Sequence, residues 1–442
     1  MVVPSNSSEQ NQLVYGIKVS SVGPGKVTGQ DVVHDPTNMD LAMKLHYLRA
    51  VYYFSSQVFE GLTVPRIKEP MFTWLNEYYY ACGRFRRSES GRPYIKCNDC
   101  GVRFIEAHCA KTLDEWLEME KEDGGLTKLL LYHQLIGPEL QFSPLVYLQI
   151  TWFKCGGGSV GLSWAHVLGD AVSASDFMKA LGHYMASSRP AQPLKFAQLD
   201  TKLGKTTNPT SQAEDPLSVK RVGPVGDNWI ATTNCKMEVF SLHLSAPQLS
   251  HLQSKVCGIA GTNSIPPFES VCALIWKSVA KIRDGPEPKV VTICRNDSHG
   301  DASGVSSNGQ MVSVVEADCS VTEASPKKLA ELMTKGAVDE RPKIEEAMER
   351  DQGLSDFIVY GANLTFVDLG AADFHGLELR GEKPVHVNCM IDGIGNEGVV
   401  LVLPLEPRDG GKGSGGKVVT LIVPESHALE LKSELKREFS IA

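Results

Sequence analysis

The segment Ser163-Trp-Ala-His166-Val-Leu-Gly169-Asp170 carries a histidine and an aspartate with three residues between them. A neutral imidazole near its ordinary pKa of about 6.5 can take a proton from an alcohol or amine that attacks a carbonyl carbon. A thioester carbonyl suits a single base of this kind, because its thiol leaving group has a pKa of only about 8.5. We therefore predict that His166 is a general base. A buried, hydrogen-bonded core histidine fits the same spacing.

Asp170 and Gly169 are predicted to have structural roles. Asp170 directly precedes a helical pattern of apolar residues, so its carboxylate can cap the free amide groups at a helix N-terminus. Gly169 lets the backbone turn sharply between His166 and that helix. About one His-x-x-x-Asp pattern is expected by chance in a chain with 12 histidines. The spacing alone therefore does not establish a catalytic pair.

The elements around His166 are predicted from hydrophobic periodicity. Apolar residues alternate along 144–153 and again along 159–164, and a glycine-rich turn at 155–158 joins the two runs into a hairpin. A helix follows from Asp170, because six apolar residues recur at helical spacing: Ala174, Phe177, Met178, Leu181, Tyr184 and Met185. We expect His166 to lie between strand and helix, exposed at the edge of a sheet where ligands approach.

The rest of the chain predicts an α/β protein of two units. A helix is expected over 38–54, behind a capping Asn38, and others over 267–283 and 424–439. Buried strands are expected at 399–403 and 418–423. Residues 188–226 lack a sustained period, which is typical of a connection between domains. We therefore divide the chain into an N-terminal domain of residues 1–190, a crossover linker of 191–226 and a C-terminal domain of 227–442.

Composition limits the partners. The formal net charge is -8, which disfavours nucleic acid and anionic lipid as main ligands. No run of about 18 apolar residues is present, so no transmembrane segment is expected. Eleven cysteines, an odd number spread over a large chain, indicate free thiols and a cytoplasmic protein. Cys97 and Cys100 have metal-ligand spacing, but no second pair follows at a fitting distance, so no metal is expected.

Several segments together resemble the BAHD acyl-CoA acyltransferase superfamily. They are Met39-Asp-Leu-Ala-Met43, Phe142-Ser-Pro-Leu145, Thr151-Trp-Phe-Lys-Cys-Gly-Gly157 and Gly161-Leu-Ser-Trp-Ala-His166. The resemblance implies two similar chloramphenicol-acetyltransferase-like domains with mixed sheets and a channel between them. It implies acyl-CoA as co-substrate, reaching His166 through that channel, and no bound cofactor. It also implies that Asp170 points away from the channel and pairs with an arginine, for which Arg295 is the candidate.

The chain departs from the family pattern in two places. The family's Asp-Phe-Gly-Trp-Gly motif corresponds to Asp373-Phe-His-Gly-Leu377, which makes Asp373 the second candidate for a catalytic position. Counting back from Lys383-Pro384 would instead align Glu378 with the motif's aspartate. The family's Phe-Gly-Asn segment is represented only by Ser307-Asn-Gly309. We expect the loop that shapes the channel to be altered.

These departures, with Gly91-Arg-Pro-Tyr-Ile-Lys-Cys-Asn-Asp-Cys-Gly101 and Tyr360-Gly-Ala-Asn-Leu-Thr-Phe366, resemble the plant eceriferum/Glossy branch tied to cuticular wax. That likeness implies a protein that promotes very-long-chain fatty-acid elongation with a membrane-bound β-ketoacyl-CoA synthase, the condensing enzyme, on the cytosolic face of the endoplasmic reticulum. Two alternatives remain. One is an acyl-CoA-dependent O- or N-acyltransferase that uses His166 as its base, and the other is a scaffold that binds acyl-CoA unchanged.

Overall fold

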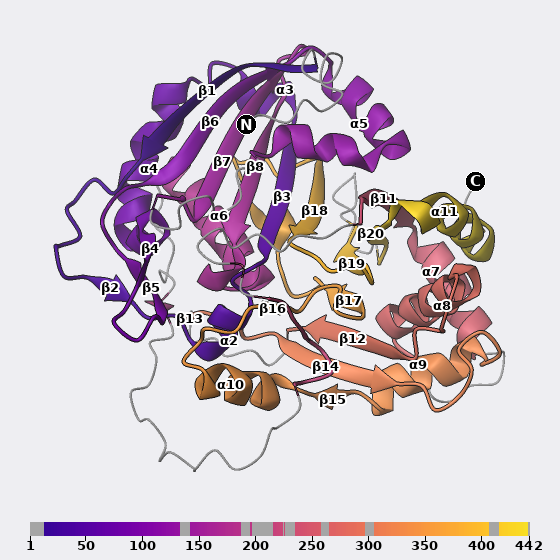
Figure 1. Ribbon diagram of the computed structural model, residues 1–442. Helices are drawn as coiled ribbons and strands as arrows, with labels where there is room; N and C mark the ends of the chain where they lie inside the picture. Colours follow the sequence, from indigo (N-terminus) through magenta and orange to yellow (C-terminus); the bar gives the residue numbers. More distant parts are fainter. Residues whose placement is uncertain are drawn as a thin grey trace.

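The computed structural model describes residues 13–132, 142–186, 195–196, 215–223, 225, 235–257, 265–296, 305–405 and 415–440. Two mixed sheets organise these residues (Figure 1). One hydrophobic cluster surrounds the first sheet and continues to buried residues of the second, such as Val367 and Leu401, and another lies between the second sheet and its helices. The predicted α/β class with two mixed-sheet units is confirmed. Most of the predicted linker, 191–226, lies outside the described residues.

The first sheet has six strands in the order β1-β6-β7-β8-β3-β18. Their bounds are β1 Val14–Val22, β6 Val102–Cys109, β7 Val146–Phe153, β8 Gly158–Ala165, β3 Tyr47–Phe54 and β18 His386–Asp392. Only the β6–β7 pair is parallel. Helices α4 (Val64–Glu77) and α6 (Ala171–Met185) pack against each other, with the Trp74 and Phe177 rings 4.2 Å apart.

Strand β18 belongs to the first sheet although it lies far along the chain. It runs antiparallel to β3, with Cys389 opposite Ala50. The predicted domain boundaries do not anticipate this crossing, because they keep residues 227–442 together. The second half of the chain therefore completes the sheet that carries His166.

The second sheet has seven strands in the order β11-β20-β19-β17-β12-β14-β15. Their bounds are β11 Met237–Leu244, β20 Lys417–Pro424, β19 Val399–Pro404, β17 Leu364–Asp368, β12 Val290–Arg295, β14 Met311–Glu316 and β15 Val338–Asp339. Its core is shared with α7 (Ala246–Cys257), α8 (Pro267–Ile282), α9 (Pro326–Lys335) and α11 (Glu425–Phe439). The helices predicted over 267–283 and 424–439, and the strands at 399–403 and 418–423, are confirmed.

Shorter elements complete the described chain. The helices are α2 Asn38–Ala42, α3 Ser56–Phe59, α5 Leu113–Glu122 and α10 Arg341–Arg350, with 3-10 turns at Tyr79–Cys82, Gly124–Leu130, His166–Leu168 and Phe374–Gly376. The remaining strands are β2 Val33–His34, β4 Arg84–Arg87, β5 Pro93–Lys96, β9 Lys195–Phe196, β10 Lys220–Arg221, β13 Val305–Ser306 and β16 Phe357–Ile358. Within the described ranges, no helix combines the length and apolarity that crossing a bilayer requires. All eleven cysteines are unpaired, as predicted.

The helix predicted over 38–54 is wrong beyond Ala42. Helix α2 has five residues, and its cap is Thr37, whose hydroxyl accepts from the Asp40 amide at 3.1 Å while the Asp40 carboxylate accepts from the Thr37 amide at 2.8 Å. The chain then enters β3, in which all eight residues are buried. A strand buried on both faces shows a continuous apolar run, which periodicity alone does not separate from a helix.

Candidate functional site

His166 lies at the predicted junction of strand and helix. Strand β8 ends at Ala165, the 3-10 turn His166–Leu168 follows, and α6 begins at Ala171. Gly169 has a φ of 137°, a backbone conformation that side-chain-bearing residues rarely adopt, and its carbonyl accepts from the Trp164 indole at 2.9 Å. The hairpin of β7 and β8 and the helix after Asp170, both predicted from the sequence, are confirmed.

The ring of His166 is enclosed. It has 0% solvent exposure, and its Nε2 is 2.8 Å from the hydroxyl of Tyr360, which also receives a hydrogen bond from the Gln310 amide at 2.8 Å. Burial lowers the pKa of His166 to about 4, so the ring is neutral at pH 7. The expectation of an exposed side chain at the sheet edge is wrong, because Tyr360 from the second half of the chain covers the ring.

His46 forms a second layer behind this pair. Its Nε2 accepts from the Val359 amide at 3.0 Å, and its ring meets the Tyr360 ring edge-on, with centroids 4.9 Å apart. Burial, and then the neighbouring His166, lower the pKa of His46 to about 3. Tyr360 is therefore held between two neutral imidazoles and Gln310, a packing that fixes the position of its hydroxyl over His166.

Asn308 ties the junction to both halves of the chain. Its side-chain amide donates to Asp40 Oδ1 at 2.8 Å and to the His166 carbonyl at 2.9 Å, and its backbone amide donates to the same Asp40 oxygen at 3.1 Å. The amide of Asp170 donates to the Ser307 carbonyl at 3.3 Å. The segments 39–43, 163–170 and 307–309 that the sequence analysis singled out thus meet at one place.

Asp170 caps α6, as predicted. Its Oδ1 accepts from the amides of Val172 and Ser173, both at 3.1 Å, and its Oδ2 accepts from the Asn296 side chain at 2.7 Å. Burial raises the pKa of this carboxyl above its ordinary value. The carboxylate is fully engaged in holding the junction, and none of these contacts reaches the ring of His166.

Arg295 is not the partner of Asp170, and that prediction is wrong. Its guanidinium lies 3.0 Å from the carboxylate of Glu269 in α8 and over the ring of Phe268. Neighbouring residues of an extended strand point to opposite sides. At the end of β12, Arg295 therefore turns to the helices, and Asn296 turns to Asp170.

The structure does not bring Asp373 to His166. The Asp373 side chain is 56% exposed and lies 3.6 Å from the ammonium group of Lys179 in α6. Glu378, from the alternative register, is exposed as well, and His375 is half-buried. The expectation that Asp373 shares a catalytic site with His166 is not met, because the Phe374–Gly376 turn packs against α6 and directs the carboxylate outward.

Four residues of the junction were not predicted as site residues from the sequence: His46, Asn296, Gln310 and Tyr360. His46 and Tyr360 lie in or next to segments that carry the family resemblance, and this position was the signal that could have pointed to them.

His166 lines neither of the two best-formed cavities in the described chain. The described residues hold no cluster of three or more metal-ligating side chains.

The fold and sequence match known proteins. A family model described as the Transferase family matches residues 34–296. Among solved structures, vinorine synthase superposes with a TM-score of 0.66 at 15% identity, covering 95% of this chain and 98% of its own. F. graminearum TRI101 complexed with coenzyme A and T-2 mycotoxin has a TM-score of 0.65 at 14% identity, covering 91% and 97%. These likenesses confirm the fold.

Relatives in sequence cover nearly the whole chain. Protein ECERIFERUM 26 of Arabidopsis thaliana is 41% identical over 436 residues, which is 98% of each chain. Protein ECERIFERUM 2 of the same plant is 39% identical, covering 96% of this chain and 98% of its own, and hydroxycinnamoyltransferase 1 of Oryza sativa subsp. japonica is 24% identical, covering 85% and 89%. The chain therefore belongs to the Transferase family of BAHD acyltransferases, among relatives that include the ECERIFERUM proteins.

Proposed function

We propose that this protein promotes very-long-chain fatty-acid elongation for cuticular wax by binding, as the partner of a membrane-bound condensing enzyme. In this proposal it does not transfer an acyl group at His166. Its likeness to ECERIFERUM 26 and ECERIFERUM 2 motivates the pathway. The observation that supports the binding mode is the Tyr360 hydroxyl, which lies 2.8 Å from Nε2 of a fully buried imidazole.

The occupied nitrogen bears directly on catalysis. A general base must reach the attacking hydroxyl or amine at roughly 2.6–3.2 Å, or through one water molecule. At His166 Nε2 that place is filled by Tyr360, whose hydroxyl is also held by Gln310. The other ring nitrogen, Nδ1, is buried and has no hydrogen-bond partner among the described residues. An acceptor substrate would have to displace Tyr360 and leave buried polar groups unpaired, which costs about 1–3 kcal/mol for each group.

A second candidate is an acyl-CoA-dependent O- or N-acyltransferase with His166 as its base. The observation that favours it is the intact junction, in which Asp170 is anchored at the start of α6 and holds the turn that carries His166. This alternative requires Tyr360 to move off the imidazole when substrate binds. The two candidates therefore differ in whether the hydrogen bond between Tyr360 and His166 breaks when substrate binds.

The proposal extends to ligand and place. Acyl-CoA is the molecule that the assembly would handle, and structures with this fold have been solved with coenzyme A, as in TRI101. We place the protein in the cytoplasm, peripheral to the cytosolic face of the endoplasmic reticulum, because the condensing enzyme that it would assist is membrane-bound.

The test is co-expression with a condensing enzyme in a host that makes shorter acyl chains, followed by measurement of the acyl-length profile. We expect longer chains with the natural protein. The His166→Gln variant should keep this effect within about twofold, since a glutamine amide can still bond Tyr360 but cannot act as a general base.

Two outcomes would contradict the proposal. An acyl profile that the natural protein leaves unchanged contradicts the elongation function. Loss of elongation in a His166→Gln variant that keeps its abundance and thermal unfolding temperature contradicts the binding mode and favours the transferase. Tyr360→Phe serves as the matched variant, because it keeps the ring but frees Nε2. A gain of acyl transfer to added alcohols in this variant alone would show that the Tyr360 hydroxyl blocks the base in the natural protein, as proposed.

A further inference from the structure

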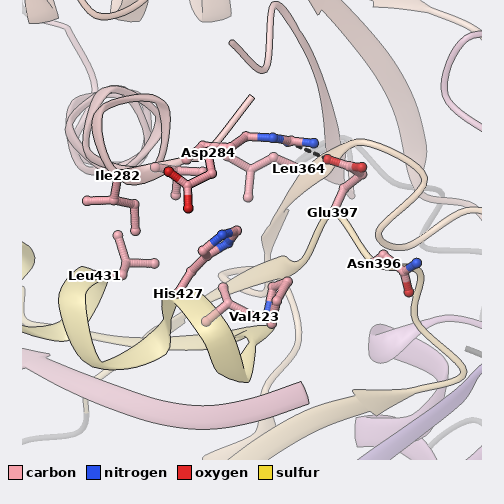
Figure 2. Close-up of a pocket in the computed structure, with 11 residues that line it drawn as sticks. Ile282, Asp284, Leu364, Asn396, Glu397, Val423, His427 and Leu431 are labelled. Carbon is pink, nitrogen blue, oxygen red and sulfur yellow. Dashed lines mark hydrogen bonds and ion pairs between the residues drawn. The ribbon is translucent and has the colours of Figure 1, made fainter. Parts of the chain in front are cut away.

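A cavity of about 130 Å³ opens in the part of the molecule built on the second sheet (Figure 2). It lies between the end of α8, the start of α11, the start of β17 and the end of β20. Its floor is apolar, and the side chains that form it are Val279, Ile282, Leu364, Val423 and Leu431. An engineered cavity of roughly 150 Å³ holds one benzene molecule. This cavity therefore has room for one ring or one short alkyl chain.

Polar side chains surround the apolar floor. The guanidinium of Arg283 forms an ion pair with Glu397, so these two charges cancel. Asp284 is exposed, and no ion pair or hydrogen bond joins its carboxylate to another residue of the described chain. In Figure 2, Asp284 and His427 enter the same space from opposite walls, and Asn396 lies at the side. The cavity thus presents one uncompensated negative charge above an apolar floor.

We propose that this cavity receives one basic side chain, arginine or lysine, from a protein partner. The aliphatic stem would cover the apolar floor while the cationic head bonds the carboxylate of Asp284, the arrangement that long basic side chains favour. A single anchor residue in a small pocket is a common source of interface affinity, and arginine is enriched at such positions. The net charge of -8 also favours a basic partner.

The size of the cavity supports a side chain over a larger ligand. A pocket for a whole small molecule typically spans about 300–1,000 Å³, whereas this one measures about 130 Å³. The inference does not rest on the proposed function, because none of the residues that it uses belongs to the His166 junction.

The test uses the full chain and two probes, n-butylguanidinium and its neutral isostere n-butylurea. Binding is followed by NMR through the methyl groups of Leu431 and the imidazole of His427. We expect n-butylguanidinium to bind and the Asp284→Asn variant to bind it about threefold more weakly, because an exposed ion pair is weak even when its hydrogen bonds are charge-assisted. Asp284 is exposed, so this variant should fold normally. Asp31→Asn, which removes an exposed carboxylate that does not line the cavity, should bind the probe as the natural protein does.

Three results would overturn the inference. Equal affinity for n-butylurea would show that the cavity takes alkyl chains without regard to charge. No shift with either probe would show that it takes neither. The peptide acetyl-Gly-Arg-Gly-amide separates the sources of the cation: if n-butylguanidinium binds and the peptide does not, an arginine of a protein partner is excluded in favour of a free guanidinium compound. Binding of the peptide, weakened in Asp284→Asn, supports the proposal.

Discussion

The His166 junction and the Asp373 loop resemble two motifs of one family, yet they have opposite environments. The junction is buried, and polar groups from residues 40, 46, 166, 170, 296, 308, 310 and 360 are joined there by hydrogen bonds. Asp373 is 56% exposed, and its carboxylate pairs with Lys179. The junction links the two halves of the chain, whereas the loop covers one helix. The family motif that this chain keeps is therefore one on which its folding depends, whether or not it performs catalysis.

Asp170→Ala should give the largest effect. The substitution removes the cap of α6 and leaves the amide of Asn296 without its acceptor. Loss of a helix cap and of a buried hydrogen-bond acceptor should lower the free energy of unfolding by about 2–4 kcal/mol. Denaturant unfolding measures this change, and a loss below about 1 kcal/mol would show that the junction does not depend on this carboxylate.

The pH dependence of stability should reveal the buried histidines. The pKa of His166 is about 4 in the folded protein and near 6.5 when unfolded, so the unfolded chain binds protons first as the pH falls. The contribution of His166 is therefore present above pH 6.5 and is lost as the pH falls toward 4, by about 2 kcal/mol between pH 7 and pH 5. In His166→Gln, the loss of unfolding free energy between pH 7 and pH 5 should be smaller by about 2 kcal/mol. Parallel curves for the two proteins would mean that the imidazole is solvated.

Asn308→Ala should have a somewhat smaller effect. It removes the side-chain bonds to Asp40 and to the His166 carbonyl, while the backbone amide still reaches Asp40. We expect a loss of about 1–2 kcal/mol, since each hydrogen bond typically contributes about 0.5–1.5 kcal/mol. Hydrogen exchange of the His166 amide should also accelerate. If neither the hydrogen exchange of the His166 amide nor the free energy of unfolding changes, Asn308 does not stabilise the junction.

Asp373→Ala should have the smallest effect. An exposed ion pair at 3.6 Å contributes about 0–1 kcal/mol, and less at high salt. Thermal unfolding should be nearly unchanged, and elongation in the co-expression assay should be retained. A large loss of elongation without a loss of stability would show that the Asp373 loop has a functional role, contrary to this prediction.

The parts of the fold and of the site that depend on local pattern were predictable from the sequence. The hairpin of β7 and β8, helix α6 and its cap Asp170 follow from periodicity and from residue chemistry at a helix start. The helix predicted over 38–54 was wrong beyond Ala42, because a strand buried on both faces and a buried helix can show the same continuous run of apolar residues. Asn296 was missed because the side to which a residue points depends on the exact end of β12. Tyr360 was missed because it reaches His166 from 194 residues away, and no local pattern encodes such a contact.

We propose that Tyr360 keeps the neutral ring of His166 out of reach of acyl donor and acceptor alike. Imidazole ¹⁵N NMR of the full chain, with the His166 signals assigned through His166→Gln, tests it most directly. We predict a ring that stays neutral down to about pH 5 and signals that do not move when long-chain acyl-CoA is added, because burial lowers its pKa to about 4. Titration near pH 6.5, together with a shift of the Nε2 signal on addition of acyl-CoA, would mean that the ring is open to solvent and substrate and can act as a base.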